Sequence, residues 1–137
     1  MPLRPLARGT LVTVSRSSTL AEVARLMDAR GVDVAVVTER RRPVGVVTTH
    51  DIVVRGVARR FPADARIDSV MTDEVVTLPA TADRREAADT LRAHGVAHLV
   101  LVDGSEPVAV LTREDLVVEL AAELAGVTGT SGTTDPL

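Results

Sequence analysis

The sequence contains one pattern twice, and this duplication limits the fold more than any other feature. The stretch VGVVTTHDIVVR at 44–55 returns 64 positions later as VAVLTREDLVVE at 108–119. The same offset relates residues 11–55 to residues 75–119 without a gap, and about a third of the paired positions are identical. A repeat of this length predicts two copies of one supersecondary unit that bury their apolar faces against each other.

Each copy begins with the signals of a strand and an amphipathic helix. In the first copy, the β-branched run at 11–14 predicts the strand, and apolar residues at helical spacing from Leu20 onward predict the helix. Thr19 and Glu22 have the spacing of a capping box at the helix start, and Gly31 suits its left-handed end. The second copy repeats these signals with a strand at 75–78, the cap residues Asp83 and Glu86, the inward residues Ala87, Ala88 and Leu91, and the terminal Gly95.

Two further apolar strands and a helix that begins near His50 or Arg113 complete each copy. The predicted fold class is therefore α/β (α+β), with two β-α-β-β-α repeats packed with pseudo-twofold symmetry. We expect the chain to divide into an N-terminal segment at 1–10, a first repeat at 11–60, a linker at 61–74, a second repeat at 75–125 and a flexible C-terminal tail at 126–137.

Composition excludes several classes of function. The chain has neither cysteine nor lysine, which removes thiolate catalysis, cysteine-held metals and a P-loop lysine. The net charge of −3 argues against a general nucleic-acid binder, and the arginines at 38–43 are expected in a solvated turn. No apolar run approaches the roughly 20 residues that span a bilayer, so we expect a cytoplasmic protein. The histidines have no metal-site spacing and no nucleophile is paired with a base, so we do not expect an enzyme.

The repeated Thr-x-x-Asp, at Thr48/Asp51 and Thr112/Asp115, supports two interpretations. The hydroxyl and the carboxylate have the spacing of a capping box, a common device at helix starts that the spacing alone favours. The same groups also suit a ligand, since a carboxylate accepts hydrogen bonds from adjacent hydroxyls such as those of a ribose. The two roles are compatible.

Both copies resemble a known family. The pattern VMT..VVTLPATA…EAADTLRAHGVAHLVLVD…PVAVLTREDLV is similar to a cystathionine-β-synthase (CBS) domain, and LVTVSRSSTLAEVARLMDARGVDVAVVTERRRPVGVVTTHDIV resembles another. The resemblance covers about residues 6–122 and implies a paired CBS module, known as a Bateman module. In that family, the aspartate binds the ribose of an adenosyl ligand, and the base lies among aliphatic strand residues.

The resemblance implies two clefts between the repeats. The residues expected in the first cleft are Thr48, Asp51 and Val46, facing Val96 and Ala97. The residues expected in the second cleft are Thr112, Asp115 and Val110, facing Val32, Asp33 and Val34.

The two clefts are predicted to differ in their affinity for phosphate. Basic residues at the start of the second strand of a repeat often contact phosphate in this family. The first repeat has Asp33 there, which we expect to disfavour phosphate in the Thr48/Asp51 cleft. The second repeat has His98, and Arg113 lies within its motif, so the Thr112/Asp115 cleft is the predicted nucleotide site. Both residues also have simpler interpretations, His98 as a strand residue bonded to backbone and Arg113 as a solvated residue.

We therefore expect a non-catalytic regulatory module that binds an adenosyl ligand and signals to a protein partner, without a required cofactor. AMP, ADP, ATP, S-adenosylmethionine and NAD all remain candidate ligands. The spare apolar faces of the last helices predict a homodimer, parallel or antiparallel, unless the N-terminal segment covers them. The alternative function is a structural or interaction module with degenerate sites that hold no ligand.

Overall fold

The computed structural model describes residues 3–129, and side chains as far as residue 126. The elements are η1 (Arg4–Leu6), β1 (Thr13–Ser15), α1 (Leu20–Arg30), β2 (Val34–Glu39), β3 (Arg42–Thr48), α2 (Thr49–Asp51), η2 (Ile52–Val57), η3 (Ile67–Ser69), β4 (Thr77–Pro79), α3 (Arg84–His94), β5 (His98–Asp103), β6 (Glu106–Thr112) and α4 (Arg113–Gly129). The short helices η1 and η3 are 3₁₀, and η2 is a π-helical continuation of α2. Helix α4 includes the first residues of the predicted tail, and the rest of that tail lies outside the described residues.

Each repeat forms a three-stranded sheet with the same topology. Strand β1 pairs in parallel with β2, which pairs antiparallel with β3, and β4, β5 and β6 repeat this order. Val36 lies opposite Val46 in the first sheet, and Val100 lies opposite Val110 in the second. The two antiparallel pairs, β2–β3 and β5–β6, each contain a register shift, and the two shifts lie 64 positions apart in the sequence. These matching registers confirm the predicted pair of β-α-β-β-α repeats.

The helix caps follow the sequence signals. Thr19 Oγ1 accepts a hydrogen bond from the N–H of Glu22 at 3.1 Å, and the carboxylate of Glu22 accepts one from the N–H of Thr19 at 2.7 Å. Gly31 ends α1 with a φ of 66°, a left-handed conformation that glycine adopts without a side-chain clash. Asp83, Glu86 and Gly95 do the same for α3. The prediction of an inward Ala88 was wrong, because Ala88 is exposed while Ala87 and Leu91 fill the core side of α3.

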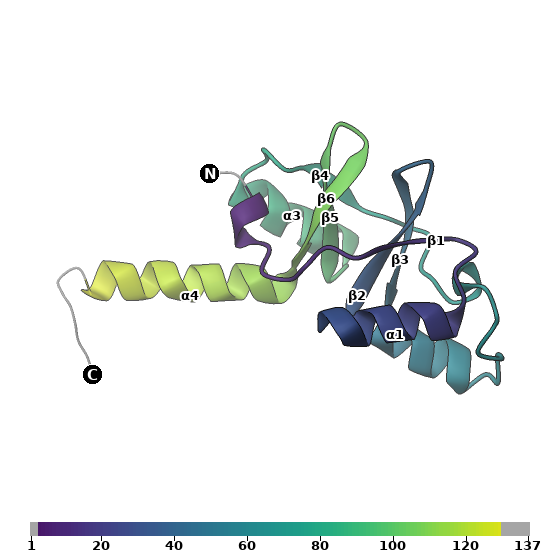
Figure 1. The fold of residues 1–137 in the computed structure, drawn as a ribbon. Helices are drawn as coiled ribbons and strands as arrows, with labels where there is room; N and C mark the ends of the chain where they lie inside the picture. The colour runs from purple at the N-terminus through teal and green to yellow at the C-terminus, as the bar shows by residue number, and fades with distance from the viewer. Residues whose placement is uncertain (1–2, 130–137) are drawn as a thin grey trace.

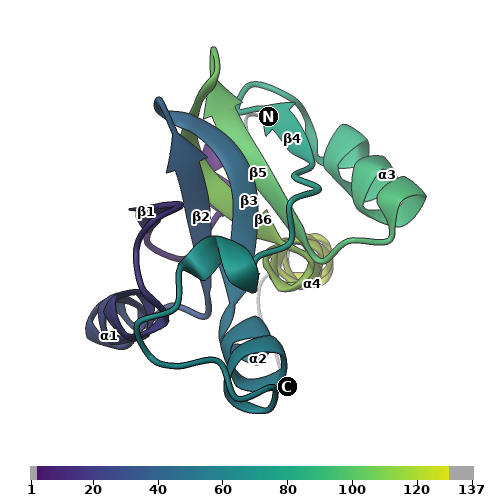
Figure 2. The ribbon, with the colours of Figure 1, turned by 90° about the vertical axis from the view of Figure 1, so that its right-hand side faces the viewer.

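The two sheets pack against each other through valine side chains. Val36, Val100 and Val110 are buried between them, and Val34 and Val46 pack against this cluster. Figure 2 shows the sheets next to each other in the middle of the molecule, with α1 and α3 on opposite outer sides. Burying one face of each sheet in this way leaves the sheet ends, where the Thr-x-x-Asp motifs lie, at the junction of the repeats.

The core of each repeat is completed by the segment that precedes the other repeat. Ile67 and Val70 are buried in the first core, although they follow the first repeat and belong to the predicted linker. Leu3 and Leu6, which stand 64 positions earlier, are buried in the second core. The linker is therefore more than a connection, and the N-terminal segment is an integral part of the second repeat.

The last helices of the two repeats leave their sheets differently. Gly56 of η2 is buried against α1, and a Cβ at this position would lie 2.8 Å from Leu20 Cδ2. The equivalent residue of α4 is Leu120, which is exposed, and Arg84 replaces Leu20 on the neighbouring helix. Helix α4 accordingly runs outward from the body of the molecule, as Figure 1 shows.

Candidate ligand-binding site

The Thr-x-x-Asp motif forms a capping box in both repeats. Thr48 Oγ1 accepts a hydrogen bond from the N–H of Asp51 at 3.1 Å, and Asp51 Oδ2 accepts one from the N–H of Thr48 at 2.9 Å. Thr112 and Asp115 make the same pair of bonds at 3.0 and 2.9 Å. These bonds satisfy backbone donors that a helix start otherwise leaves unpaired. The predicted capping role is confirmed for both copies.

The caps use only part of the hydrogen-bonding capacity of the motif. A carboxylate offers about four lone-pair positions, and a threonine hydroxyl both donates and accepts. In each cap, Oδ2 of the aspartate accepts one hydrogen bond and the hydroxyl oxygen of the threonine accepts the other. The hydrogen bonds between described residues include none to Oδ1 of Asp51 or Asp115. One carboxylate oxygen and one hydroxyl proton in each motif are therefore available to a ligand.

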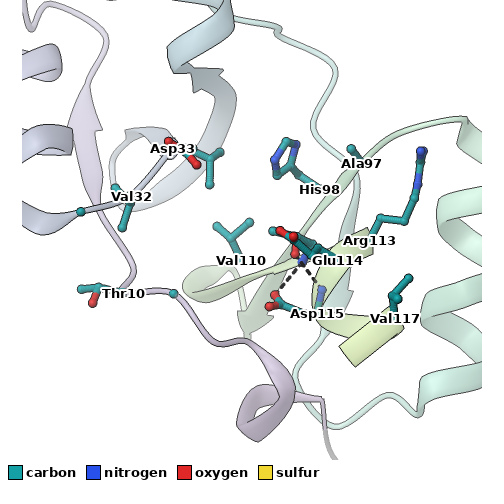
Figure 3. A pocket seen from close by; sticks show the side chains of 14 residues that line it. Thr10, Val32, Asp33, Ala97, His98, Val110, Arg113, Glu114, Asp115 and Val117 are labelled. Atoms are coloured by element: carbon teal, nitrogen blue, oxygen red, sulfur yellow. Dashed lines mark hydrogen bonds between the residues drawn. The ribbon is translucent and has the colours of Figure 1, made fainter. Parts of the chain in front are cut away.

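The Thr112/Asp115 motif lines a cavity of about 620 Å³, the larger cavity, at the junction of the repeats. Figure 3 shows Val32 and Asp33 of the first repeat across this space from Val110, Glu114 and Asp115 of the second. The cavity wall also contains Gly9, Thr10, Gly31, Val34, Ala97, His98, Arg113 and Val117. Asp115 is only 7% exposed, so a group bonded to its carboxylate is largely shielded from water. The structure thus brings together the residues predicted for the second cleft.

The Thr48/Asp51 motif lines a separate cavity of about 190 Å³, the smaller cavity. Its wall contains the predicted residues Val46, Thr48, Asp51, Val96 and Ala97, and also Thr72, Glu74, Val76, His98 and Val100. A volume this small is below the usual range of about 300–1,000 Å³ for sites that enclose a small molecule. The two motifs therefore open onto spaces of unequal size.

Asp33 lies in the larger cavity and is not among the residues that line the smaller one. The prediction that Asp33 disfavours phosphate in the Thr48/Asp51 cleft was therefore wrong. The side chain at the start of β2 faces across the junction to the motif of the other repeat. Because Glu114 and Asp115 line the same cavity, three carboxylates surround a space that was expected to receive phosphate.

The guanidinium of Arg113 does not balance this negative charge. It donates a hydrogen bond to the carbonyl oxygen of Val96 at 3.0 Å. In Figure 3 the side chain extends away from the space between Asp33 and Asp115. Arg113 is an exposed residue of the first helical turn, in agreement with the simpler of its two interpretations.

His98 lies between the two cavities and lines both of them. Burial lowers the pKa of its imidazole, and Arg113 acts in the same direction, whereas the carboxylates of Asp51 and Asp115 act to raise it. The net shift is downward, so the imidazole is neutral near pH 7. A neutral ring can donate one hydrogen bond to a ligand but supplies no positive charge for a phosphate. The equivalent residue of the first repeat is Val34.

Several lining residues were missed by the sequence interpretation. Thr10 of the larger cavity and Glu74 of the smaller cavity come from the segments that precede each repeat. The two are 64 positions apart, so the repeat offset was the signal that relates them. They were missed because these segments were interpreted as connections and not as parts of the fold.

Other kinds of site find no support in the part of the chain that the structure describes. Within it, no three histidine, cysteine or carboxylate side chains are grouped as metal ligands. No helix among the described residues is long and apolar enough to cross a membrane.

Comparison with known proteins assigns each repeat to the same family. The CBS domain family model matches residues 4–57 and residues 67–122. Each match begins at the 3₁₀ segment that precedes a repeat, which agrees with the place of η1 and η3 in the fold. The match includes no catalytic family, and CBS domain pairs are generally non-catalytic regulatory modules.

Two relatives share moderate identity with the chain. An uncharacterized protein of Methanocaldococcus jannaschii is 30% identical over 117 residues, which cover 82% of this chain and 62% of that protein. The CBS domain-containing protein YhcV of Bacillus subtilis is 28% identical over 117 residues, which cover 85% of this chain and 84% of YhcV. The chain thus spans about three fifths of the archaeal relative and most of the bacterial one.

Solved structures show the same fold. A CBS domain protein of Pyrobaculum aerophilum complexed with AMP is 30% identical, with a TM-score of 0.75 over 89% of this chain and 99% of that one. The CBS domain pair of protein MJ0100, in complex with 5′-methylthioadenosine and S-adenosyl-L-methionine, is 17% identical, with a TM-score of 0.75 over 88% of this chain and 99% of that one. The duplicated unit, the packing of its sheets and the two family matches lead to one conclusion: the chain belongs to the CBS domain family, as a tandem pair.

Proposed function

We propose that this chain is a non-catalytic regulatory module of the cytoplasm that binds an adenosyl compound in the larger cavity and signals its presence to a protein partner. The observation that carries the proposal is the convergence of three features on one space. These features are the carboxylate oxygen of Asp115 that the cap does not use, the hydroxyl of Thr112, and an aliphatic wall that includes Val32 and Val110. All three line the same cavity of about 620 Å³. A ribose diol bonded to Asp115 would direct its base toward those valines.

Known complexes of related proteins support an adenosyl ligand. The Pyrobaculum aerophilum relative was solved with AMP, and the MJ0100 pair with 5′-methylthioadenosine and S-adenosyl-L-methionine. The charges of the larger cavity favour the second kind of ligand. Asp33, Glu114 and Asp115 repel a phosphate chain, whereas they attract the sulfonium and ammonium groups of S-adenosylmethionine and do not oppose the uncharged methylthioadenosine. We therefore rank S-adenosylmethionine and methylthioadenosine above AMP, and AMP above ADP, ATP and NAD.

The proposed route for the signal is helix α4. Its first turn carries Thr112 as the cap and Asp115 as the ligand contact, and its later turns run out from the body of the protein. A ligand that binds one orientation of this first turn more tightly than another shifts the population of α4 orientations. The proposed working unit is a homodimer, which transmits this change in the orientation of α4 to its protein partner.

Titration calorimetry with a panel of adenosyl compounds tests the proposal. We expect S-adenosylmethionine or methylthioadenosine to bind, and a ligand at 100 times its dissociation constant to stabilise the fold by roughly 2.7 kcal/mol in a thermal shift assay. ATP should bind most weakly. The proposal fails if no compound of the panel binds with a dissociation constant below about 1 mM, a free energy of binding of about −4.1 kcal/mol.

A second candidate function is a structural or interaction module that holds no ligand. It is favoured by the capping boxes, which by themselves account for the threonine and the aspartate of both motifs. Under this function, the calorimetric panel gives no heat of binding with either the wild-type chain or Asp115→Asn.

A further inference from the structure

A strap, residues 7–10, borders the larger cavity, and the segment 64 positions later borders the smaller cavity. That later segment is bonded to the edge of strand β3. The N–H of Val46 donates to the carbonyl oxygen of Thr72 at 2.9 Å, and the N–H of Thr72 donates to that of Val46 at 2.9 Å. The equivalent residues are Arg8 and Val110, and no hydrogen bond between described residues joins these two. The strap is therefore open where its counterpart is closed.

The edge of β6 that faces the strap has unpaired backbone groups. The N–H of Val100 donates to the carbonyl oxygen of Val76 at 3.0 Å, on the β4 side of β5. Val110 lies opposite Val100, so its own N–H and carbonyl point to the outer edge of β6, as antiparallel pairing requires. The hydrogen bonds between described residues include none to either group, although Val110 is only 9% exposed. Buried backbone groups without partners are costly, so this edge favours pairing with another extended segment.

The side chains of the strap show how closure changes the larger cavity. Thr72 and Glu74, two positions apart, both line the smaller cavity, as alternate residues of an extended segment do. Of their two counterparts, Thr10 lines the larger cavity, but Gly9 takes the place of Arg8 in its wall. Arg8 is exposed, and its guanidinium makes no hydrogen bond or ion pair with a described residue. A strap closed in the manner of its counterpart turns Arg8 into the larger cavity.

We propose that Arg8 is a specificity-determining residue: the strap closes onto β6 when AMP fills the larger cavity, and the guanidinium binds the phosphate. This inference rests on the proposed function and adds a residue to its site. The cavity otherwise lacks a cation, because three carboxylates line it while Arg113 extends away and His98 is neutral. A guanidinium binds phosphate through two parallel hydrogen bonds and keeps its charge at any physiological pH. Arg8 thus reduces the repulsion that ranks AMP below the uncharged methylthioadenosine.

Amide hydrogen exchange followed by NMR tests the closure of the strap. We expect the amides of Arg8 and Val110 to exchange quickly in the free protein and both to become protected at saturating AMP. Val46 and Thr72 already form the closed pair, so their amides are the internal standard and should be protected with and without AMP. Protection of Val110 alone would show that the ligand itself bonds to β6 and would overturn the closure. Unchanged exchange at both amides, in a protein that binds AMP by calorimetry, would overturn the closure and leave the proposed function standing.

Substitution of Arg8 tests the role of its guanidinium. We expect Arg8→Ala to weaken the binding of AMP about tenfold and that of methylthioadenosine by less than about twofold, since only AMP carries a phosphate. Arg4→Ala is the matched control, because Arg4 is also an exposed arginine of the N-terminal segment but lines neither cavity. Equal weakening of both ligands, or unchanged affinity for AMP, would overturn the role of Arg8 in specificity. If methylthioadenosine binds the wild-type chain and AMP does not, this inference fails and the proposed function stands. If no adenosyl compound binds, both fail.

Discussion

Replacing Asp115 by asparagine separates the two roles of this side chain. The amide oxygen of asparagine can still accept the hydrogen bond that Asp115 Oδ2 receives from the N–H of Thr112 at 2.9 Å. Asparagine and aspartate cap helices about equally well, and only the interaction of the charge with the helix start is lost. The free energy of unfolding should therefore fall by less than about 1 kcal/mol.

The effect of the same substitution on the ligand should be much larger. The second carboxylate oxygen becomes an NH₂ group, which donates and cannot accept from a ribose hydroxyl. A charge-assisted hydrogen bond contributes about 1.5–3 kcal/mol, and Asp115 is 7% exposed, so water cannot readily replace it. A loss of roughly 2–3 kcal/mol corresponds to affinity weaker by about 30- to 150-fold. Titration calorimetry with S-adenosylmethionine or methylthioadenosine measures this change.

Two matched substitutions control for the cap. Asp83 caps α3 with the same geometry, accepting from the N–H of Glu86 at 2.9 Å, but lines neither cavity. Asp83→Asn should therefore change stability as Asp115→Asn does and leave affinity unchanged. Asp51→Asn should have a smaller effect on binding, because its cavity is about 190 Å³. Wild-type affinity in Asp115→Asn, at wild-type stability, would refute the role of Asp115 as a ribose contact.

Three further outcomes follow from the structure. Gly45→Ala should destabilise the fold by about 1–3 kcal/mol in urea titrations, because its Cβ would lie 2.4 Å from Met71 Sδ. Met71→Ala removes a buried side chain and is destabilising by itself, but the loss in the double variant should be smaller than the sum of the two single losses. Additive effects would contradict this contact. Asp33→Asn should raise the affinity for AMP about threefold relative to S-adenosylmethionine in calorimetry, and an unchanged ratio would count against the acidic lining. The pKa of His98 is lowered in the folded state, so the unfolded chain takes up its proton first as the pH falls below about 6.5. Stability should therefore decrease with falling pH in that window, and His98→Gln should reduce the decrease in melting temperature between pH 7.5 and 5.5; an equal decrease in both proteins would contradict it.

The repeat offset predicted most of the fold because it compares the chain with itself. The strand registers, the capping boxes and the glycine at the end of each first helix all recur at that offset, and each depends on residues close in sequence. The same local character explains the correct placement of the two motifs at helix starts. Signals of this kind need no knowledge of tertiary packing.

The errors, and the alternatives that the sequence left open, concern side chains whose surroundings come from elsewhere in the chain. Asp33 was correctly expected opposite Thr112 and Asp115, but its effect on phosphate was assigned to the Thr48/Asp51 cavity, although the start of strand β2 faces the motif of the other repeat. The direction of Arg113 depends on the carbonyl of Val96, which the sequence does not place. Ile67 and Leu3 were considered parts of connections, because only the packed structure shows that each completes the core of the other repeat. Long-range packing decided these cases.

The capping boxes also change what the duplicated motif means for function. Both helices need a cap to satisfy their first backbone donors, so Thr-x-x-Asp serves folding in each repeat even where no ligand binds. Two motifs therefore do not imply two ligand sites. The number of ligand sites depends on the residues that line the two cavities, and these residues differ between the repeats. His98 stands where the first repeat has Val34, and the volume is about 620 Å³ for the larger cavity and about 190 Å³ for the smaller one. Binding of one ligand per chain, in the larger cavity, is the stoichiometry that these walls favour.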